Sequence, residues 1–396
     1  MKTQSALITA DVIKWARKKA HYDLKTAAKK IGVTPKKLEE WENGKNFPTM
    51  TQARKMSQVY RRPLASFYLP HPPKGFPLLK DFRTVEGKAP KYSTALIFLM
   101  RQIQERQIWL KDYLKEQEGQ KPLKFIGSAQ RNSSPKTLSK NIIKTLWGSE
   151  KEYSQKVPKK IETLLKNCIN QCEEKGIFIS RTSHLNPHNV ISVKEARGFV
   201  ISDEYAPFIF INSSDSKPAQ LFTLFHELAH LWLDVSGVPD HFSIGWKSNR
   251  SSTEFLCNQT AAEILMPEES IKNFSKMEEL EEVKNFVEEK HKKFPVSHLA
   301  FLVRLKSFSL LSDTVFKQLR NEYIKNSEEY KKKQKRKMKE AKGGPNANKL
   351  KIYSNGESFT KIVAFSYKEG LISGREASTL LDMKLNRMEK IIPMLG

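Results

Sequence analysis

The sequence predicts a mostly helical α+β protein that contains one small sheet. The chain has 396 residues, which is enough for two or three domains with separate cores. Apolar residues recur at helical spacing along most of it. Only three short runs, at residues 176–180, 198–202 and 207–212, have the aromatic and β-branched composition of strands. We therefore expect few strands and many helices.

Residues 1–70 are predicted to form a compact helical unit. Within it, residues 24–49 read LKTAAKKIGVTPKKLEEWENGKNFPT. Gly32 would form the turn between two helices, and Gly44 and Pro48 would end the second helix. The residues expected to pack these helices together are Ala27, Ala28, Ile31, Leu38 and Trp41. The run resembles the helix-turn-helix of Xre/Cro-type repressors, which implies an N-terminal helix-turn-helix bundle.

The charge of the chain favours a polyanionic partner such as nucleic acid. The net charge is +26, and residues 1–75 hold 16 Lys and Arg against 5 Asp and Glu. In a helix-turn-helix, residues near the start of the second helix meet base edges. Here they include Lys36 and Lys37, while Glu39 and Glu40 beside them are unfavourable near phosphates. We predict duplex DNA as a partner, with Lys36 and Lys37 as contacts.

The alternative for this unit is that it only docks another domain of the chain or recruits a similar repressor.

Residues 71–160 follow as a predicted linker and helical segment. Prolines at positions 70, 72, 73 and 77 interrupt regular structure. Apolar residues then recur at helical spacing from 93 to 118, and a further helix is expected at 161–174, directly before the first strand.

The stretch FHELAHLWL, residues 225–233, contains the most informative motif of the chain. Asp215 and Ser216 are candidate caps for the helix that carries it. Residues four apart share a face of a helix, so His226 and His230 can present two imidazole nitrogens to one zinc ion. Glu227 lies beside that face, where it can reach a bound water without being a ligand. The alternative is a polar, half-exposed helix surface.

A catalytic zinc needs a third protein ligand, and the candidates are His241, Glu254 and Glu263. A metzincin would have its third histidine at position 236, which is Ser236, so that subclass is excluded. Glu254 and Glu263 are half a turn out of phase on one predicted helix, so only one of them can face the metal.

Glu254 begins the predicted helix STEFLCNQTAAEILMP, residues 252–267, with Asn258 one turn further on. The small residues Ala261 and Ala262 would let this helix approach the first one closely. Glu254 would complete a His/His/Glu set, and Asn258 could hold one imidazole from outside the coordination sphere. The alternative for Glu254 is a capping box with Ser251.

HELAH followed by E-x-x-C-N and A-A-E-I-L-M-P resembles the ImmA/IrrE family of zinc metallopeptidases over residues 161–305. The resemblance implies a zincin-like peptidase domain at 161–324, with zinc bound by His226, His230 and Glu254 and with Glu227 as general base. Cys257 stands where alanine is common in the family. Members cleave repressor proteins of mobile elements and stress regulons, which implies a similar substrate here.

Peptidases of this general build hold the substrate as an extra strand on a sheet edge. Residues 207–212 are the natural candidate for that edge, although their continuous apolar run also fits a buried central strand. The sequence identifies no firm oxyanion stabiliser. Tyr205, His241 and His298 are candidates, and the alternative for each is a structural or solvated side chain.

The remainder of the chain is predicted to be helical to about residue 323. A basic linker follows at 325–350, for which a solvated helix tail and a nucleic-acid contact are the two interpretations. Residues 351–396 should form a small helical module with a turn near Met383. That module is either a second helix-turn-helix or a pair of helices docked on a core.

Compartment and function follow from these features. The three cysteines provide no disulfide framework, and no apolar run reaches the roughly 18 residues needed to span a membrane. We therefore expect a cytoplasmic protein without a membrane partner. The sequence predicts a zinc-dependent endopeptidase that cleaves a protein regulator, with a DNA-binding repressor of a mobile element, toxin–antitoxin pair or stress regulon as the expected substrate. The rival is a DNA-binding regulator or antitoxin-like module whose zinc site is structural.

Overall fold

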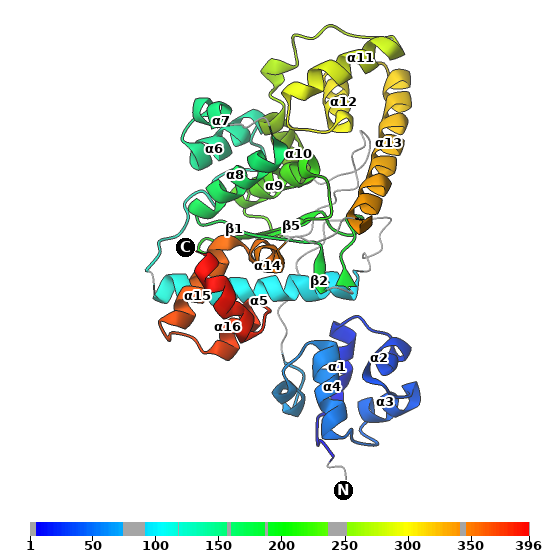
Figure 1. Cartoon of the computed structure of the whole chain (residues 1–396), viewed down its shortest axis with the longest axis vertical. Helices are drawn as coiled ribbons and strands as arrows, with labels where there is room; N and C mark the ends of the chain where they lie inside the picture. The colour runs from blue at the N-terminus through cyan, green and yellow to red at the C-terminus, as the bar shows by residue number, and fades with distance from the viewer. Residues whose placement is uncertain are drawn as a thin grey trace. The chain divides into compact units, whose positions relative to one another are not determined.

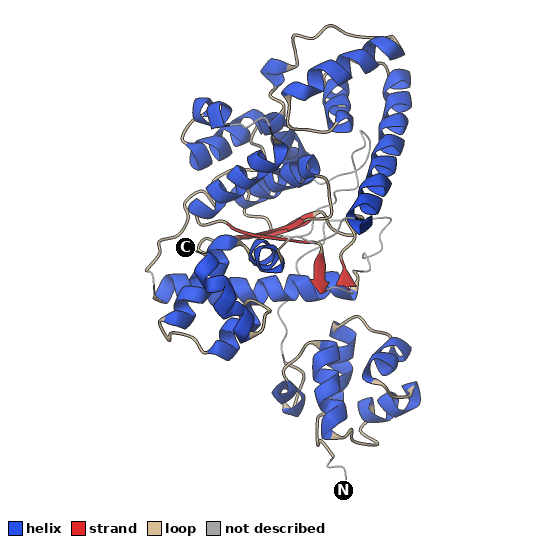
Figure 2. Ribbon diagram, viewed as in Figure 1, coloured by secondary structure: helices blue, strands red, loops and turns tan. Residues whose placement is uncertain are grey.

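A computed structural model of the chain is mostly helical with a small sheet, as the sequence predicts (Figure 2). It describes residues 5–73, 92–117, 119–156, 160–186, 189–236, 252–340 and 346–395. The chain divides into two compact units. Unit 1 comprises Met1–Leu79, Pro90–Ile103 and His184–Ile191, and unit 2 comprises the rest of the chain. The finer domain limits drawn from the sequence remain predictions.

Unit 1 contains the predicted helical bundle. Its elements are α1 (Ala10–Lys19), α2 (Leu24–Ile31), α3 (Pro35–Glu42), α4 (Met50–Tyr60) and the 3-10 helix η1 (Leu64–Tyr68), together with the first part of α5 (Thr94–Glu116). The short hairpin β2 (His184–Asn186) and β3 (Asn189–Val190), which the sequence did not predict, also belongs to this unit.

The α2–α3 pair is built as the sequence predicts. Asp23 caps α2 by accepting from the Thr26 amide, and Gly32 turns the chain with a φ of 86°. A positive φ of this kind favours glycine because it has no Cβ atom. The five residues expected to pack the pair are all buried: Ala27, Ala28, Ile31, Leu38 and Trp41.

Unit 2 is organised around a three-stranded sheet whose order is β1–β5–β4. Strand β1 (Phe178–Thr182) runs parallel to β5 (Phe208–Asn212), and β4 (Gly198–Ile201) runs antiparallel to it. All five residues of β5 are buried. The expectation that residues 207–212 form the edge for substrate is therefore wrong, because β5 is paired on both sides. The two strands at the ends of the order are β1 and β4, and all four residues of β4 are buried.

Helices cover the sheet from both sides (Figure 1). On one side lie α6 (Pro135–Trp147), α7 (Glu150–Lys156), α8 (Ile161–Glu174), α9 (Lys217–Trp232) and α10 (Ser252–Leu265). Helix α9 packs against β4, β5, α6, α8 and α10, so it occupies the centre of the apolar core. This position shields α9 from solvent and makes it a rigid support for polar side chains.

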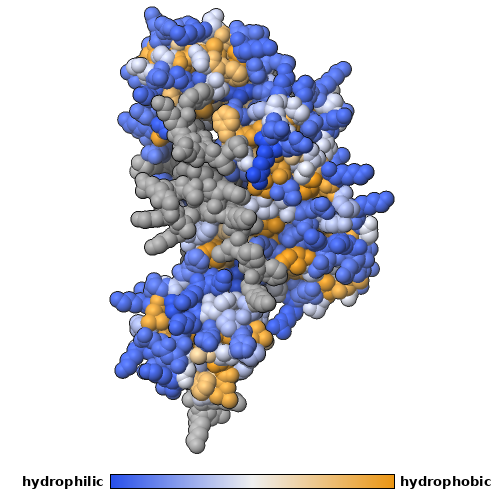
Figure 3. Space-filling model, turned by 180° about the vertical axis from the view of Figure 1, so that it is seen from behind, coloured by the Kyte–Doolittle hydropathy of each residue, from blue (hydrophilic) through white to orange (hydrophobic). Residues whose placement is uncertain are grey.

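The remaining helices of unit 2 are α11 (Leu280–Lys290), α12 (His298–Ser307), α13 (Asp313–Glu340), α14 (Ala347–Asn355), α15 (Glu357–Lys368), α16 (Gly374–Leu380) and α17 (Leu385–Ile391), with the 3-10 helices η2 (Glu268–Ser270), η3 (His291–Lys293) and η4 (Ile392–Met394). Residues 325–340, in the predicted basic linker, continue helix α13. None of the helices in the described part of the chain combines the length and the apolar composition that a membrane span requires. Hydrophilic residues predominate on the face in Figure 3, in keeping with a chain that is 28% charged.

Candidate metal centre

Helix α9 carries the HELAH motif on a segment that is buried on every side. It begins after Ser216 with a proline in its first turn, and every residue from Thr223 to Trp232 is buried. His226, Glu227 and His230 have exposed fractions of 1%, 0% and 2%. A half-exposed polar surface is thereby excluded for these three side chains. Buried polar groups of this kind require partners.

Helix α10 supplies the partner by packing along α9. Glu254, in its first turn, places Oε2 at 3.4 Å from His226 Nε2 and Oε1 at 3.2 Å from His230 Nε2. The two imidazole Nε2 atoms lie 3.1 Å from each other. Of the described residues, His226, His230 and Glu254 are the ones whose ligand atoms come together closely enough to hold a metal ion.

The spacing of these atoms fits a zinc ion. Tetrahedral zinc with bonds of about 2.0–2.1 Å holds its ligand atoms about 3.3–3.4 Å apart. The two Nε2 atoms are 3.1 Å apart, and the Glu254 carboxylate places one oxygen 3.2 Å from His230 Nε2 and the other 3.4 Å from His226 Nε2. Two imidazoles and one carboxylate are also a donor set that zinc accepts. The residues present therefore could hold zinc with little rearrangement.

The electrostatics of the cluster point the same way. Burial alone would raise the pKa of Glu254, but hydrogen bonds from the two imidazoles hold it well below its usual range, so the group is a carboxylate. Burial lowers the pKa of His230, which keeps that imidazole neutral. Neutral imidazole and ionised carboxylate are the protonation states in which these side chains bind metal.

Glu227 is completely buried beside the two histidines, and its position depends on Gly198 in β4. A Cβ atom at Gly198 would lie 2.5 Å from Thr223 Cγ2, 2.8 Å from the Phe210 carbonyl oxygen and 3.0 Å from Glu227 Oε1. Such distances are too short for any side chain larger than hydrogen. Burial, followed by the charge of Glu254, raises the pKa of Glu227 well above its usual range.

Gly198 was not predicted from the sequence as part of the site. The signal was the glycine at the start of an otherwise β-branched and aromatic strand, because a glycine within a strand often marks close approach of another backbone or side chain. Here the approaching group is helix α9, which brings Thr223 and Glu227 against the strand.

The other acidic candidate on α10, Glu263, has a different role. Its carboxylate accepts from the buried Arg304 guanidinium and from the Glu268 amide. Arg304 in turn donates to the Met266 carbonyl oxygen at 3.1 Å. Glu263 therefore belongs to a buried ion pair that ties α12 to the end of α10.

The remaining predicted residues are placed as follows. Asn258 is half-buried on α10, and within the described part of the chain no hydrogen bond joins it to either imidazole. His241 and Ser251 lie outside the described residues. Tyr205 lies beneath the ammonium groups of Lys111 and Lys115, and the His298 ring packs against His291 at a tilt of 31° with ring centroids 3.6 Å apart. The oxyanion roles considered for Tyr205 and His298 remain predictions.

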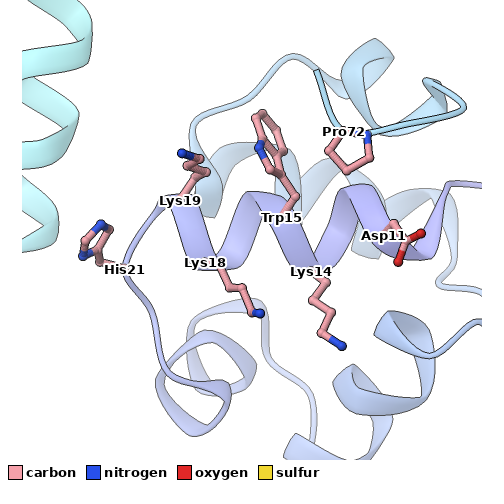
Figure 4. A pocket seen from close by; sticks show the side chains of 7 residues that line it. All are labelled: Asp11, Lys14, Trp15, Lys18, Lys19, His21 and Pro72. Carbon is pink, nitrogen blue, oxygen red and sulfur yellow. The ribbon is translucent and has the colours of Figure 1, made fainter. Parts of the chain in front are cut away.

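In unit 1, the two predicted DNA contacts are accessible. Lys36 and Lys37 are exposed in the first turn of α3, and Lys37 Nζ lies 5.9 Å from the centroid of the Trp41 ring. The same unit has an open hollow of about 490 Å³ along α1 (Figure 4). Its lining residues are Asp11, Lys14, Trp15, Lys18, Lys19, His21 and Pro72, and none of them belongs to the metal cluster.

Comparison with known families finds one match for the helical bundle of unit 1 and another for the part of unit 2 that carries the metal cluster. Residues 172–306 match the family model described as the IrrE N-terminal-like domain, a peptidase family, and residues 13–67 match the model described as helix-turn-helix. The chain thus combines a metallopeptidase-type domain with an Xre/Cro-type helix-turn-helix, the architecture that its motifs resemble. No match was found among curated proteins or among solved structures.

Proposed function

We propose that the chain is a zinc-dependent endopeptidase that cleaves a protein regulator, with a DNA-binding repressor as the substrate class. The observation that carries the proposal is the convergence of His226, His230 and Glu254 on one point beside a buried glutamate. The two Nε2 atoms lie 3.1 Å apart, and each lies 3.2–3.4 Å from one oxygen of the Glu254 carboxylate, close to the spacing of ligand atoms around tetrahedral zinc.

In this proposal His226, His230 and Glu254 hold the zinc ion and Glu227 is the general base. When bound, zinc lowers the pKa of a water to about 7 and polarises a carbonyl oxygen. Glu227 follows His226 in the chain, so its carboxylate is beside the ligands without being one of the three. The positive charge of a bound zinc ion would lower the raised pKa of Glu227, and as a carboxylate it would take the proton of the attacking water and return it to the leaving amine. Its complete burial excludes bulk water from that transfer.

Strand β4 is our proposed docking edge for the substrate. The Asn212 amide donates to the Arg197 carbonyl oxygen at 2.7 Å, which sets the alternation of the antiparallel ladder between β4 and β5. By that alternation, the amide and carbonyl groups of Gly198 and Val200 point away from β5. A peptide added there as a strand would pass next to Gly198, and therefore next to Glu227.

The second candidate function is a DNA-binding regulator in which zinc only holds the fold. The helix-turn-helix match and the net charge of +26 favour it. The two functions differ in what they require of Glu227. A structural zinc site needs no general base, whereas a peptidase cannot work without one.

Glu227→Gln is the experiment that separates them. Glutamine keeps the shape of glutamate but cannot accept a proton from water, so cleavage should fall by at least roughly 10²–10⁴-fold. Zinc content should remain at about one ion per chain, since Glu227 is not a proposed ligand. The substrates to test are the regulators encoded beside this gene, incubated with the purified wild-type and variant proteins.

The in-cell readout is relief of repression by the same regulator. Under the peptidase proposal, Glu227→Gln leaves repression in place while still binding its partner. Normal relief by Glu227→Gln, together with failure of His226→Ala, would mean that zinc supports the fold and that no proteolysis takes place.

A further inference from the structure

The C-terminal helices α16 and α17 match the α2–α3 pair of unit 1 in their starts, first cap, turn and four buried positions at a shift of 350 residues, although the Thr34 cap of α3 has no counterpart at Lys384. Helix α2 begins at Leu24 and α16 at Gly374, while α3 begins at Pro35 and α17 at Leu385. Neither match to a family model extends to this part of the chain. The comparison therefore stands on the geometry of the two pairs alone.

The cap of the first helix and the turn in each pair also lie at positions 350 residues apart. Asp23 caps α2 by accepting from the amide three residues on, and Ser373 caps α16 in the same way. Gly32 adopts the left-handed conformation with a φ of 86°, and Asp382 does so with a φ of 48°. After that residue, the Val33 amide donates to Ala28 and the Met383 amide donates to Ser378, both at 3.0 Å.

The buried positions obey it as well. The four that pack each pair together are Ala27, Ile31, Leu38 and Trp41 in the first and Ala377, Leu381, Met388 and Ile391 in the second. A helix-turn-helix packs through a few apolar positions. These are a small residue in the first helix, a large apolar residue before the turn, and two apolar residues about one turn apart in the second helix. Two helices that merely dock on a core would not be held to the same cap, turn and burial pattern.

We propose that residues 373–391 form a second helix-turn-helix, and that its outer face is a second binding surface for duplex DNA. The positions of α3 that face DNA in such a motif include Lys36, Lys37 and Glu40, whose counterparts are Asn386, Arg387 and Lys390. Asn386 and Lys390 are exposed, and asparagine is a side chain that reads adenine in the major groove. Lys390 replaces Glu40, an acidic side chain that is unfavourable near phosphates.

The second helix pair is as basic as the first. Residues 23–42 contain five lysines and four acidic residues, and residues 373–392 contain four lysines and arginines and three acidic residues. The two pairs therefore have the same net charge. Within the second pair, Arg387 is partly engaged, because its guanidinium donates to Asn348 Oδ1 and to the Ala347 carbonyl oxygen. Lys384 and Lys390 are the cations left exposed on or next to α17.

The back of the second pair is anchored to the peptidase-containing unit. The Leu380 carbonyl oxygen accepts from buried Arg106 at 2.7 Å, and the Leu381 carbonyl oxygen accepts from Asn355 at 2.9 Å. Arg106 also donates to Asn355 Oδ1, which closes a network between α5, α14 and α16. These bonds hold the pair by its turn side and fix it to unit 2, so DNA bound by α17 would be held by the unit that carries the metal cluster.

The test is duplex binding by the full-length protein, measured by fluorescence anisotropy across a series of salt concentrations. The probe variant is Lys384→Glu with Lys390→Glu. Its matched control is Lys361→Glu with Lys368→Glu, which makes the same charge change at exposed residues of α15. Circular dichroism melting curves show whether each variant folds as the wild type does.

Each phosphate contact contributes about 0.9 to the slope of log affinity against log salt. Loss of two contacts should therefore lower that slope by about 2 and weaken binding at least tenfold at about 0.1 M salt. The control should bind nearly as the wild type does. Equal weakening by both variants, or wild-type binding by the probe variant, would overturn the proposal. If the probe variant binds DNA as the wild type does but no longer cleaves the regulator, the helix pair is a docking surface for protein and not for DNA.

Discussion

The metal cluster of unit 2 and the helix-turn-helix of unit 1 place their functional side chains in opposite environments. His226, His230 and Glu254 are at most 5% exposed. The Glu254 carboxylate oxygens lie 3.2 and 3.4 Å from the two imidazole Nε2 atoms. Lys36 and Lys37 extend into solvent from the first turn of α3. Buried charges interact strongly and respond little to salt, whereas exposed charges are screened.

This difference teaches where single substitutions should matter. In the buried cluster the geometry is set in advance, so the loss of one side chain removes the function of the others. On the exposed surface each lysine adds an increment of binding, so substitutions there should act gradually and in proportion to charge.

Removal of a proposed ligand should abolish both zinc binding and cleavage. His226→Ala and Glu254→Ala each leave two protein ligands, fewer than the three of a catalytic zinc site. Zinc content measured by atomic emission should fall from about one ion per chain to a small fraction of that. Full zinc retention by Glu254→Ala, with loss of zinc in His241→Ala, would transfer the third ligand to His241.

Glu263→Ala is the matched control for Glu254→Ala, because it makes the same change nine residues further along α10. It leaves buried Arg304 without its carboxylate partner, which should cost about 3–5 kcal/mol of unfolding free energy. Zinc content of the folded protein should stay at the wild-type level. Chemical denaturation measures the first effect and metal analysis the second; zinc loss here would show that the two glutamates are not separate in function.

Gly198→Ala should impair cleavage by disturbing the contact between β4 and α9. The added methyl group would overlap Thr223 and the Phe210 carbonyl oxygen, and such overpacking typically costs about 1–3 kcal/mol. It would also displace Glu227, so kcat should fall by more than the stability loss explains. Zinc content should be retained. Cleavage at the wild-type rate by a variant that is destabilised would show that the close contact serves the fold only.

Lys36→Glu combined with Lys37→Glu should give the smallest and most salt-dependent effect. If both side chains contact phosphates, affinity for duplex DNA should fall about tenfold or more at about 0.1 M salt and the difference should shrink as salt rises. Cleavage of a regulator in the absence of DNA should be unchanged. Anisotropy titrations at several salt concentrations provide the measurement, and unchanged affinity at low salt would remove these lysines from the interface.

Local relations along the chain were within reach of the sequence alone. His226, Glu227 and His230 lie on one short helix, so the helical repeat places them together whatever surrounds the helix. The same holds for the α2–α3 pair, whose cap, glycine turn and apolar spacing lie within twenty residues. The presence of three strands was also predictable from composition, and all three are found in the sheet.

Relations between distant segments were decided by tertiary structure. Glu254 and Glu263 are equally acidic and share one helix, and the rotation of α10 against α9 selects Glu254 for the cluster while Glu263 pairs with Arg304. Strand order is of the same kind. The apolar run at 207–212 fits an edge or a centre, and pairing with both β1 and β4 makes it the centre. Gly198 acquires its importance only because α9 packs against it. The physical reason is that a helix or strand pattern specifies which face is buried, whereas the partner of that face depends on how all the elements pack at once.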